Sequence, residues 1–214
     1  MTIAAGKPGR DCPRCPRLVA YRESLRAKEP AWFNGPVPSF GSVDAQLLIV
    51  GLAPGVQGAN RTGRPFTGDY AGVLLYDTLS RFGFANGKFD ARTDDGLELI
   101  DCRITNAVRC VPPENKPTTV EIHTCRDFLN PTIAEMKKLR AIVALGSIAH
   151  YSVVTAFGAK KSKTPFKHAG RHEMGNIAFF SSYHCSRYNT NTGVLTPEMF
   201  RNVFEKVRDF LDAA

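Results

Sequence analysis

The sequence has no apolar run long enough to cross a membrane. Its longest apolar runs, such as the one around residues 47–50, fall far short of the roughly 20 residues that a spanning helix needs. The first residues contain no apolar core followed by a cleavage site, as a secretion signal would. We therefore expect a cytoplasmic protein, where disulfides are rare, so the six cysteines need another explanation.

Nucleotide-binding motifs and internal repeats are also missing. No Gly-Lys-Ser/Thr follows the first predicted strand, and GLAPG at 51–55 lacks the spaced glycines of a dinucleotide fingerprint. Acidic residues are scarce: 20 Asp and Glu stand against 28 Lys and Arg, for a net charge of +8. This balance suggests a polyanionic partner, with nucleic acid the first candidate, although ordinary solubility charge explains it equally well.

The 214 residues are enough for one domain, and we expect a single domain over 1–214. Apolar runs alternate with segments of helical spacing, which predicts an α/β fold with a mostly parallel sheet. The expected strands are 45–52, 99–110, 141–146 and 176–184, and the expected helices are 15–29, 71–84, 118–139 (one helix or two, broken at Pro131), 146–158 and 196–211.

In such a sheet, ligands bind beyond the carboxyl ends of the strands. Four loops should meet there: 51–72, 106–117, 146–150 and 184–195. The first of them contains six glycines, two arginines and one carboxylate in 22 residues. Glycine lets backbone approach a ligand closely, so this loop is the leading candidate for a binding wall.

Four cysteines are placed to share a metal group. A CxxC near the N-terminus is followed by one cysteine at the end of the second strand and one on the next helix: Cys12, Cys15, Cys110 and Cys125. Four thiolates suit a zinc ion or an iron–sulfur cluster, and the alternative is a redox CxxC with scattered core cysteines. We expect Cys102, inside a strand, to be core packing.

Several segments, in order, resemble the uracil-DNA glycosylase superfamily and, more narrowly, its type B or fifth family of bacteria and archaea. They are GLAPG, GANRTGRPFTGDYAG, ITNAVRC, ALGSIAH and HCSRYNTNTG, together with the four cysteines. The resemblance implies a three-layer α/β/α sandwich with a central four-stranded parallel sheet. It also implies a structural [4Fe–4S] cluster on the four cysteines, holding the N-terminal helix to the segment after the second strand.

The chain departs from the superfamily pattern in two loops. His184-Cys185-Ser186 stands where His-Pro-Ser is usual, so Cys185 either loosens the loop or fills the space of the proline. Leu52 and Ala53 stand where many superfamily members have Asp, Asn or Glu, as is usual for type B. The most familiar water-activating residue is therefore missing.

The resemblance assigns the chemistry to three polar side chains. Asp69 would orient the attacking water or stabilise positive charge on the sugar, although it also suits a helix N-cap. Asn106 would read the edge of uracil, with a turn cap as the alternative. His184 would donate a hydrogen bond to the departing base, with a structural histidine as the alternative.

Other residues would bind the flipped base and the DNA around it. Phe66 is the candidate stacking platform, or otherwise a core residue anchoring its loop. The expected substrate-binding residues are Gly51, Ala53, Gly55, Phe66, Asn106, Ser186, Arg187 and Asn189. The expected DNA contacts are Arg61, Arg64, Arg187 and Tyr188, with Lys160, Lys161 and Lys163 as further phosphate candidates or a solvated charge run.

The resemblance thus predicts a monomeric, monofunctional DNA glycosylase that hydrolyses the bond between uracil and deoxyribose in DNA. No lysine is evident near the predicted pocket, so no lyase step is expected. Type B relatives also accept deaminated purines, such as hypoxanthine and xanthine. Two alternatives remain: a non-catalytic protein that binds uracil-DNA, and a zinc-stapled nucleotide-binding domain.

Overall fold

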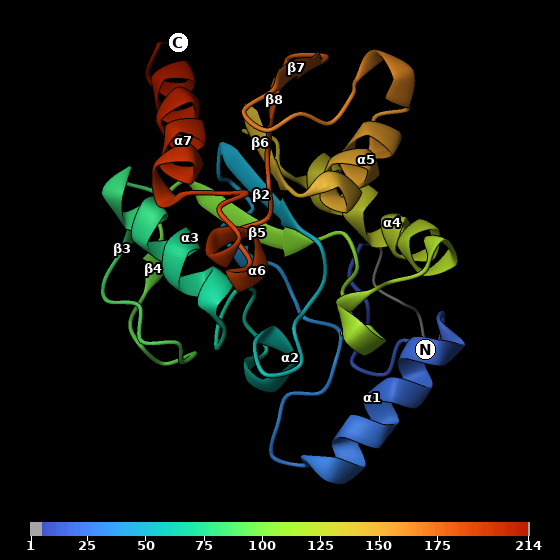
Figure 1. Ribbon diagram of the computed structural model, residues 1–214. Helices are drawn as coiled ribbons and strands as arrows, with labels where there is room; N and C mark the ends of the chain where they lie inside the picture. The colour runs from blue at the N-terminus through green and yellow to red at the C-terminus, as the bar shows by residue number, and fades with distance from the viewer. Residues whose placement is uncertain (1–5, 214) are drawn as a thin grey trace.

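A six-stranded sheet lies at the centre of the computed structural model, which describes residues 6–213 (Figure 1). The strand order is β1-β5-β2-β6-β8-β7. The four inner strands run parallel, and each edge strand is antiparallel to its neighbour. The strands are β1 (Phe40–Gly41), β2 (Leu47–Gly51), β5 (Cys102–Asn106), β6 (Ala141–Leu145), β7 (Arg171–Met174) and β8 (Ile177–Ser182).

Helices cover both faces of this sheet. Helices α3 and α7 pack on one face and α4 and α5 on the other, while α1 lies at the margin beside the start of α4 (Figure 1). The helices are α1 (Pro16–Lys28), α2 (Ala59–Thr62), α3 (Tyr70–Arg81), α4 (Thr119–Glu135), α5 (Ser147–Ala156), α6 (Arg187–Asn191) and α7 (Pro197–Asp212), with 3-10 turns η1 (Pro113–Asn115) and η2 (Lys161–Lys163).

The alternation of side chains along each inner strand builds two cores. In β2, Leu47 and Ile49 join the core under α3 and α7, whereas Leu48 and Val50 join the core under α4 and α5. All five residues of β2 are buried, as expected for a parallel strand covered on both faces. The predicted α/β/α sandwich and its four parallel strands are therefore confirmed.

The sheet is wider than predicted, because β1 and β7 add antiparallel edges. Strand β7 lies in a polar stretch where no strand was predicted, and a small separate sheet joins β3 (Ala85–Asn86) to β4 (Glu98–Leu99). Helix α4 is one helix and not two, since it continues through Pro131 to Glu135. No helix among the described residues is both long and apolar enough to cross a bilayer.

Candidate functional site

A cavity of about 580 Å³ opens where the inner strands reach their carboxyl ends. Its wall comes from the glycine-rich loop after β2, the start of α3, the turn after β5 and the loop after β8. The lining residues are Leu52, Ala53, Gly55, Gln57, Gly68, Asp69, Tyr70, Ala71, Asn115, His184, Ser186 and Arg187. The volume lies in the range typical of small-molecule pockets, and Asp69 and His184 share it.

Asp69 stands between helix α3 and this cavity. As N-cap, its Oδ1 accepts a hydrogen bond from the Gly72 amide at 3.4 Å, so the capping alternative is confirmed. Its other oxygen lies against the backbone of Gly58, where an added Cβ would approach Oδ2 to 2.4 Å. Burial raises the pKa of the Asp69 carboxyl, and hydrogen bonds from the Gly72 and Ala71 amides limit the increase.

His184 lies between two cavities. It lines the 580 Å³ cavity and also a second one of about 270 Å³, and Leu52 is the other residue common to both. The Asn189 side-chain amide donates to the His184 carbonyl at 2.8 Å, which fixes the backbone there. Burial of the imidazole lowers the pKa of His184 to about 4, so the ring is neutral at physiological pH.

Gly51, Phe66 and Asn106 form a tight group beside His184. Gly51 pairs with Asn106 in the sheet register, and a Cβ added to Gly51 would come within 2.4 Å of the Asn106 Oδ1 and 2.7 Å of the Phe66 ring. The Phe66 ring stacks on the His184 ring, with centroids 5.9 Å apart. Phe66 and Asn106 are 8 % and 3 % exposed and do not line the cavity, so a base can contact either of them only if the wall in front of them moves aside.

The backbone of Phe66 is strained and is fixed from two sides. Its φ is +55°, a left-handed value that disfavours a bulky side chain. The preceding Pro65 carbonyl accepts a hydrogen bond from the Tyr76 hydroxyl of α3 at 2.6 Å. A Cβ on Gly72 would reach the Phe66 carbonyl at 1.8 Å, so α3 passes directly beneath the loop.

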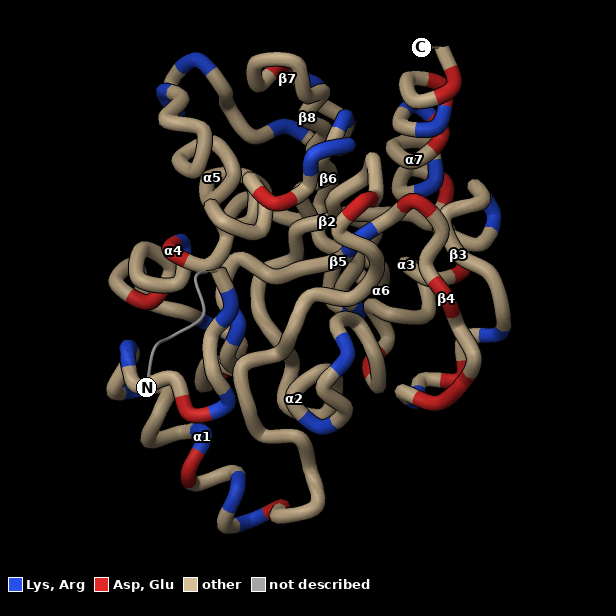
Figure 2. The backbone as a smooth tube through the Cα atoms, turned by 180° about the vertical axis from the view of Figure 1, so that it is seen from behind, with Lys and Arg blue, Asp and Glu red and all other residues tan. Residues whose placement is uncertain are grey.

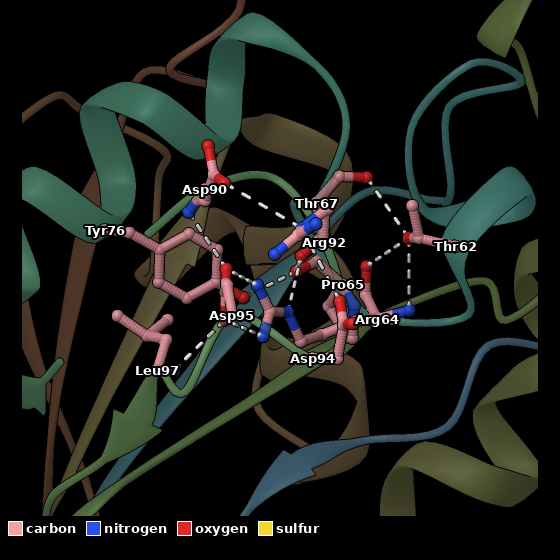
Figure 3. Close-up of polar contacts among 10 residues, drawn as sticks. All are labelled: Thr62, Arg64, Pro65, Thr67, Tyr76, Asp90, Arg92, Asp94, Asp95 and Leu97. Carbon is pink, nitrogen blue, oxygen red and sulfur yellow. Dashed lines mark hydrogen bonds and ion pairs between the residues drawn. The ribbon is translucent and has the colours of Figure 1, made fainter. Parts of the chain in front are cut away.

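Arg64 anchors the same loop, and its prediction as a DNA contact is wrong. Its guanidinium makes a two-pronged ion pair with Asp95, at 2.8 and 2.6 Å, and its Nε donates to the Thr67 hydroxyl at 2.8 Å (Figure 3). The Arg64 side chain is only 6 % exposed and that of Asp95 is fully buried. A guanidinium enclosed and paired in this way is not free to meet a phosphate.

The loop after β8 presents a short helix at the cavity mouth. Ser186 caps α6 by accepting from the Asn189 amide, and Arg187 lies over the Tyr70 ring at 5.5 Å. The Tyr188 side chain is 75 % exposed. Cys185, by contrast, is completely buried, with its Sγ 3.5 Å from the Ala71 carbonyl oxygen.

The remaining predicted DNA contacts lie at the surface. Arg61 is exposed on α2, and its guanidinium passes over Gly68 at the cavity rim. Lys160, Lys161 and Lys163 are exposed in and beside η2. Ala53 and Gly55, predicted to contact the substrate, do line the 580 Å³ cavity.

The four predicted metal-binding cysteines lie together. Cys12, Cys15, Cys110 and Cys125 line one enclosed hollow between the start of α1, the end of the β5 loop and α4. In residues 6–213, no three His, Cys, Asp or Glu side chains are placed to hold a single metal ion. Cys102 is fully buried in the main core, as predicted.

The surroundings of this hollow fit an iron–sulfur cluster. Leu18, Val108 and Phe128 pack around the cysteines, and the Arg109 amide donates to the Cys125 Sγ at 3.3 Å. Arg14, Arg22 and Arg109 also line the hollow and would offset thiolate charge. Hydrogen bonds to sulfur and low solvent exposure are features that tune such clusters.

Burial also affects the protonation of these thiols. It raises the pKa of Cys125 to about 11 and that of Cys110 to about 12. Both side chains are therefore protonated at neutral pH until a metal displaces the protons.

Sequence reasoning missed several site residues. Gln57, Tyr70 and Asn115 line the main cavity, and Ser147 and Tyr183 line the second. Each lies in or beside one of the four loops expected at the carboxyl edge, and this position was the only signal available. Asp95 gave no signal at all, because it lies 31 residues from Arg64 in an unassigned loop.

Comparisons with known proteins agree with this architecture. The model of the uracil DNA glycosylase superfamily matches residues 38–208. A type-5 uracil-DNA glycosylase of Thermus thermophilus is 43 % identical over 92 % of each chain. One from Pyrobaculum aerophilum is 38 % identical over 92 % of this chain and 87 % of its own.

A more distant relative is similar over the same length. A type-4 uracil-DNA glycosylase of Pyrobaculum aerophilum is 32 % identical over 92 % of this chain and 86 % of its own. The family model spans the glycine-rich loop, β5, β6, β8 and the loop after it, which are the segments that build the cavity. The chain therefore belongs to the uracil DNA glycosylase superfamily and, within it, to the type-5 uracil-DNA glycosylases.

Proposed function

We propose that the chain excises uracil from DNA by hydrolysing the glycosidic bond, the first step of base excision repair. One observation carries the proposal: Asp69 and His184 line the same 580 Å³ cavity in a chain 43 % identical to a type-5 uracil-DNA glycosylase. A base stacked in a duplex is inaccessible, so the nucleotide must rotate out of the helix into this cavity. The net charge of +8 favours binding to the phosphate backbone.

Asp69 is proposed to act on the sugar side of the cavity. Its carboxylate would orient a water towards the anomeric carbon and stabilise the positive charge that develops there. Leu52 and Ala53 offer no acid or amide in the loop after β2, so within the cavity lining Asp69 is the only carboxylate. A positioned general base typically contributes about 10²–10⁴-fold.

His184 and Asn106 are proposed to act on the base. As the bond breaks, negative charge develops on the base oxygen, and the N–H of a neutral imidazole would stabilise it by donating a hydrogen bond. Asn106 would pair with the donor and acceptor edge of uracil. Phe66 would support the base face beside Gly51, since its ring is already held by the strained loop.

The loop after β8 is proposed to enter the duplex. Tyr188 is exposed at the mouth of the cavity and would occupy the gap left by the rotated base, while Ser186, Arg187 and Asn189 shape the loop around it. We also propose that Arg61 contacts a phosphate at the cavity rim.

We further propose that Cys12, Cys15, Cys110 and Cys125 hold a [4Fe–4S] cluster. Its contribution would be structural: the bound cluster would join α1 to the β5 loop and to α4. Purified protein should then contain iron and sulfide and show broad visible absorption, whereas the zinc alternative predicts zinc and a colourless protein.

A glycosylase assay tests the function and separates it from mere binding. The protein is incubated with duplexes containing uracil, hypoxanthine or xanthine, and the products are split at abasic sites with alkali. The proposal predicts strand breaks at uracil, and we expect deaminated purines to be cut as well. Intact uracil strands despite tight binding would support the non-catalytic alternative, and breaks without alkali would reveal a lyase step.

A further inference from the structure

Three hollows adjoin one another along the carboxyl edge of the sheet. The 580 Å³ cavity shares Leu52 and His184 with the 270 Å³ cavity. The latter shares Ile148 with a third cavity of about 150 Å³. Because α4 and α5 both begin at this edge, the third cavity, formed by residues of α4, α5 and η2, continues the line of hollows away from Asp69.

The third cavity is cationic and contains no acid. It is lined from α4, α5 and η2, and its charged or polar side chains converge from separate elements. The lining residues are Thr119, Ile122, His123, Arg126, Ile148, Tyr151, Ser152 and Lys161. Two full positive charges and an imidazole without a carboxylate are suited to a bound anion.

The cations of this cavity are not neutralised by nearby acids. The Arg126 Nε is buried without a hydrogen-bond partner among the described residues. The acids nearest to it on α4 are occupied elsewhere: Glu121 pairs with Arg17 at 2.8 Å, and Asp127 pairs with Arg14 at 2.9 Å. A buried donor left unpaired is costly, so an external acceptor at this point would be bound favourably.

We propose that this cavity binds a backbone phosphate of the DNA strand whose rotated nucleotide occupies the 580 Å³ cavity. The proposal rests on the proposed function, because DNA is the polyanion that this cavity would bind. The adjoining hollows form the path along which the strand would pass His184 and Ile148. Arg126 and Lys161 are the charged contacts. Phosphate contacts of this kind fix the register of a strand without reading its sequence.

The proposal distinguishes among the three lysines near η2. All three are exposed, but only Lys161 lines the cavity, where its ammonium group lies 5.6 Å from the Tyr151 ring centre. Figure 2 shows Lys and Arg positions along the loop between α5 and β7. Lys160 and Lys163 are therefore assigned to general surface charge.

The salt dependence of DNA binding tests this site. The double variant R126Q/K161Q is compared with wild type by titrating a labelled duplex, with and without uracil, at several salt concentrations. Two lost phosphate contacts should reduce the slope of log affinity against log salt by about 2. The charge-matched control K137Q/K138Q lies before β6, at the opposite edge of the sheet, and should leave the slope unchanged.

Two results would overturn the proposal: a wild-type slope for R126Q/K161Q, or an equal reduction in the control. If the double variant fails to fold, K161Q alone, at an exposed position, should still reduce the slope by about 1. Undamaged duplex keeps the test independent of catalysis. A wild-type protein that excises nothing would refute the proposed function, yet its slopes would still report on the phosphate site.

Discussion

Asp69 caps helix α3 and lines the cavity with the same carboxyl group. Its raised pKa means that burial disfavours the charged form more in the folded chain than in the unfolded one. The stability contributed by this group is therefore present at low pH and is lost as the pH rises through the folded pKa. The deprotonated carboxylate is therefore kept at a cost in stability, which is typical of a functional group.

Replacing Asp69 with Asn should separate its two roles. Asn caps a helix as well as Asp does, so the thermal midpoint of Asp69→Asn at pH 7 should equal or exceed that of wild type. Single-turnover excision should fall about 10²–10⁴-fold, because Asn cannot accept a proton from water. Unchanged excision would remove Asp69 from the mechanism.

His184 should act as a neutral donor across the physiological range. The pKa of about 4 places the titration of His184 on the acid side of neutrality, and burial raises the pKa of Asp69 above that of an ordinary carboxyl. Wild-type single-turnover excision should therefore fall as the pH is lowered and Asp69 takes up a proton, with no additional step at the pKa of a free imidazole. An acidic limb that persists unchanged in Asp69→Asn would contradict this assignment.

The His184→Ala variant tests the role of the donor itself. The chemical step should decrease about 10²–10³-fold, as when one preorganised donor to a developing oxyanion is removed. DNA affinity, measured on an undamaged duplex, should decrease much less. Equal losses in rate and affinity would instead indicate a structural histidine.

The glycine-rich loop works as an element because its glycines leave room for side chains from elsewhere. Gly58 has φ −93° and ψ −117°, a combination outside the regions that L-residues favour, so alanine there meets a backbone cost as well as a clash, because its Cβ would lie 2.4 Å from the Asp69 Oδ2. Gly58→Ala should displace the carboxylate and reduce excision at least tenfold while the protein remains folded. Gly9→Ala, whose Cβ meets no atom within 4 Å, is the matched control and should behave as wild type.

The ion pair between Arg64 and Asp95 joins this loop to the segment before β4. Asp95→Asn leaves a buried guanidinium without a counter-charge, so the free energy of unfolding should fall by on the order of 3 kcal/mol. Asp94→Asn, next to it in an exposed ion pair, should change it by less than about 1 kcal/mol. Urea denaturation of both variants measures the two free energies of unfolding. Equal losses in the two variants would contradict a stabilising role for the ion pair between Arg64 and Asp95.

The pH dependence of this ion pair has the opposite sign to that of Asp69. Hydrogen bonds from Arg64 lower the pKa of Asp95 well below its usual value. The stability from Asp95 is therefore present above its unfolded pKa and is lost as the pH falls towards the folded value. The difference in stability between wild type and Asp95→Asn should shrink in acid.

Elements with a clear pattern of apolar residues could be predicted from the sequence, and elements without such a pattern could not. Strands β2 and β6 are apolar runs and β8 begins with four apolar residues, so the sequence reveals them, whereas β5 mixes apolar and polar residues although all five are buried. The edge strand β1 and the pair β3–β4 have only two residues each and present no pattern. Arg64 was misassigned because a loop arginine is normally exposed, and only the three-dimensional pairing with Asp95 reveals its burial.

At the scale of the whole molecule, the four cysteines come from segments far apart in sequence and line one hollow. Cys125→Ser should abolish the visible absorption and iron content, lower the thermal midpoint and make α1 more sensitive to proteolysis, because the proposed cluster would join α1 to the β5 loop and to α4. Cys102→Ala, in the main core, should lose stability through a small cavity but retain its iron. Full iron content in Cys125→Ser would contradict the proposed ligand set.

The central claim is that the rotated nucleotide lies between Asp69 and His184. A crystal structure of Asp69→Asn with a uracil-containing duplex tests it most directly, because the variant should bind substrate without cleaving it. The account predicts the sugar beside residue 69 and the base against Phe66, within hydrogen-bond distance of Asn106 and His184. A nucleotide bound elsewhere, or a sugar beyond the reach of a single bridging water from residue 69, would contradict it.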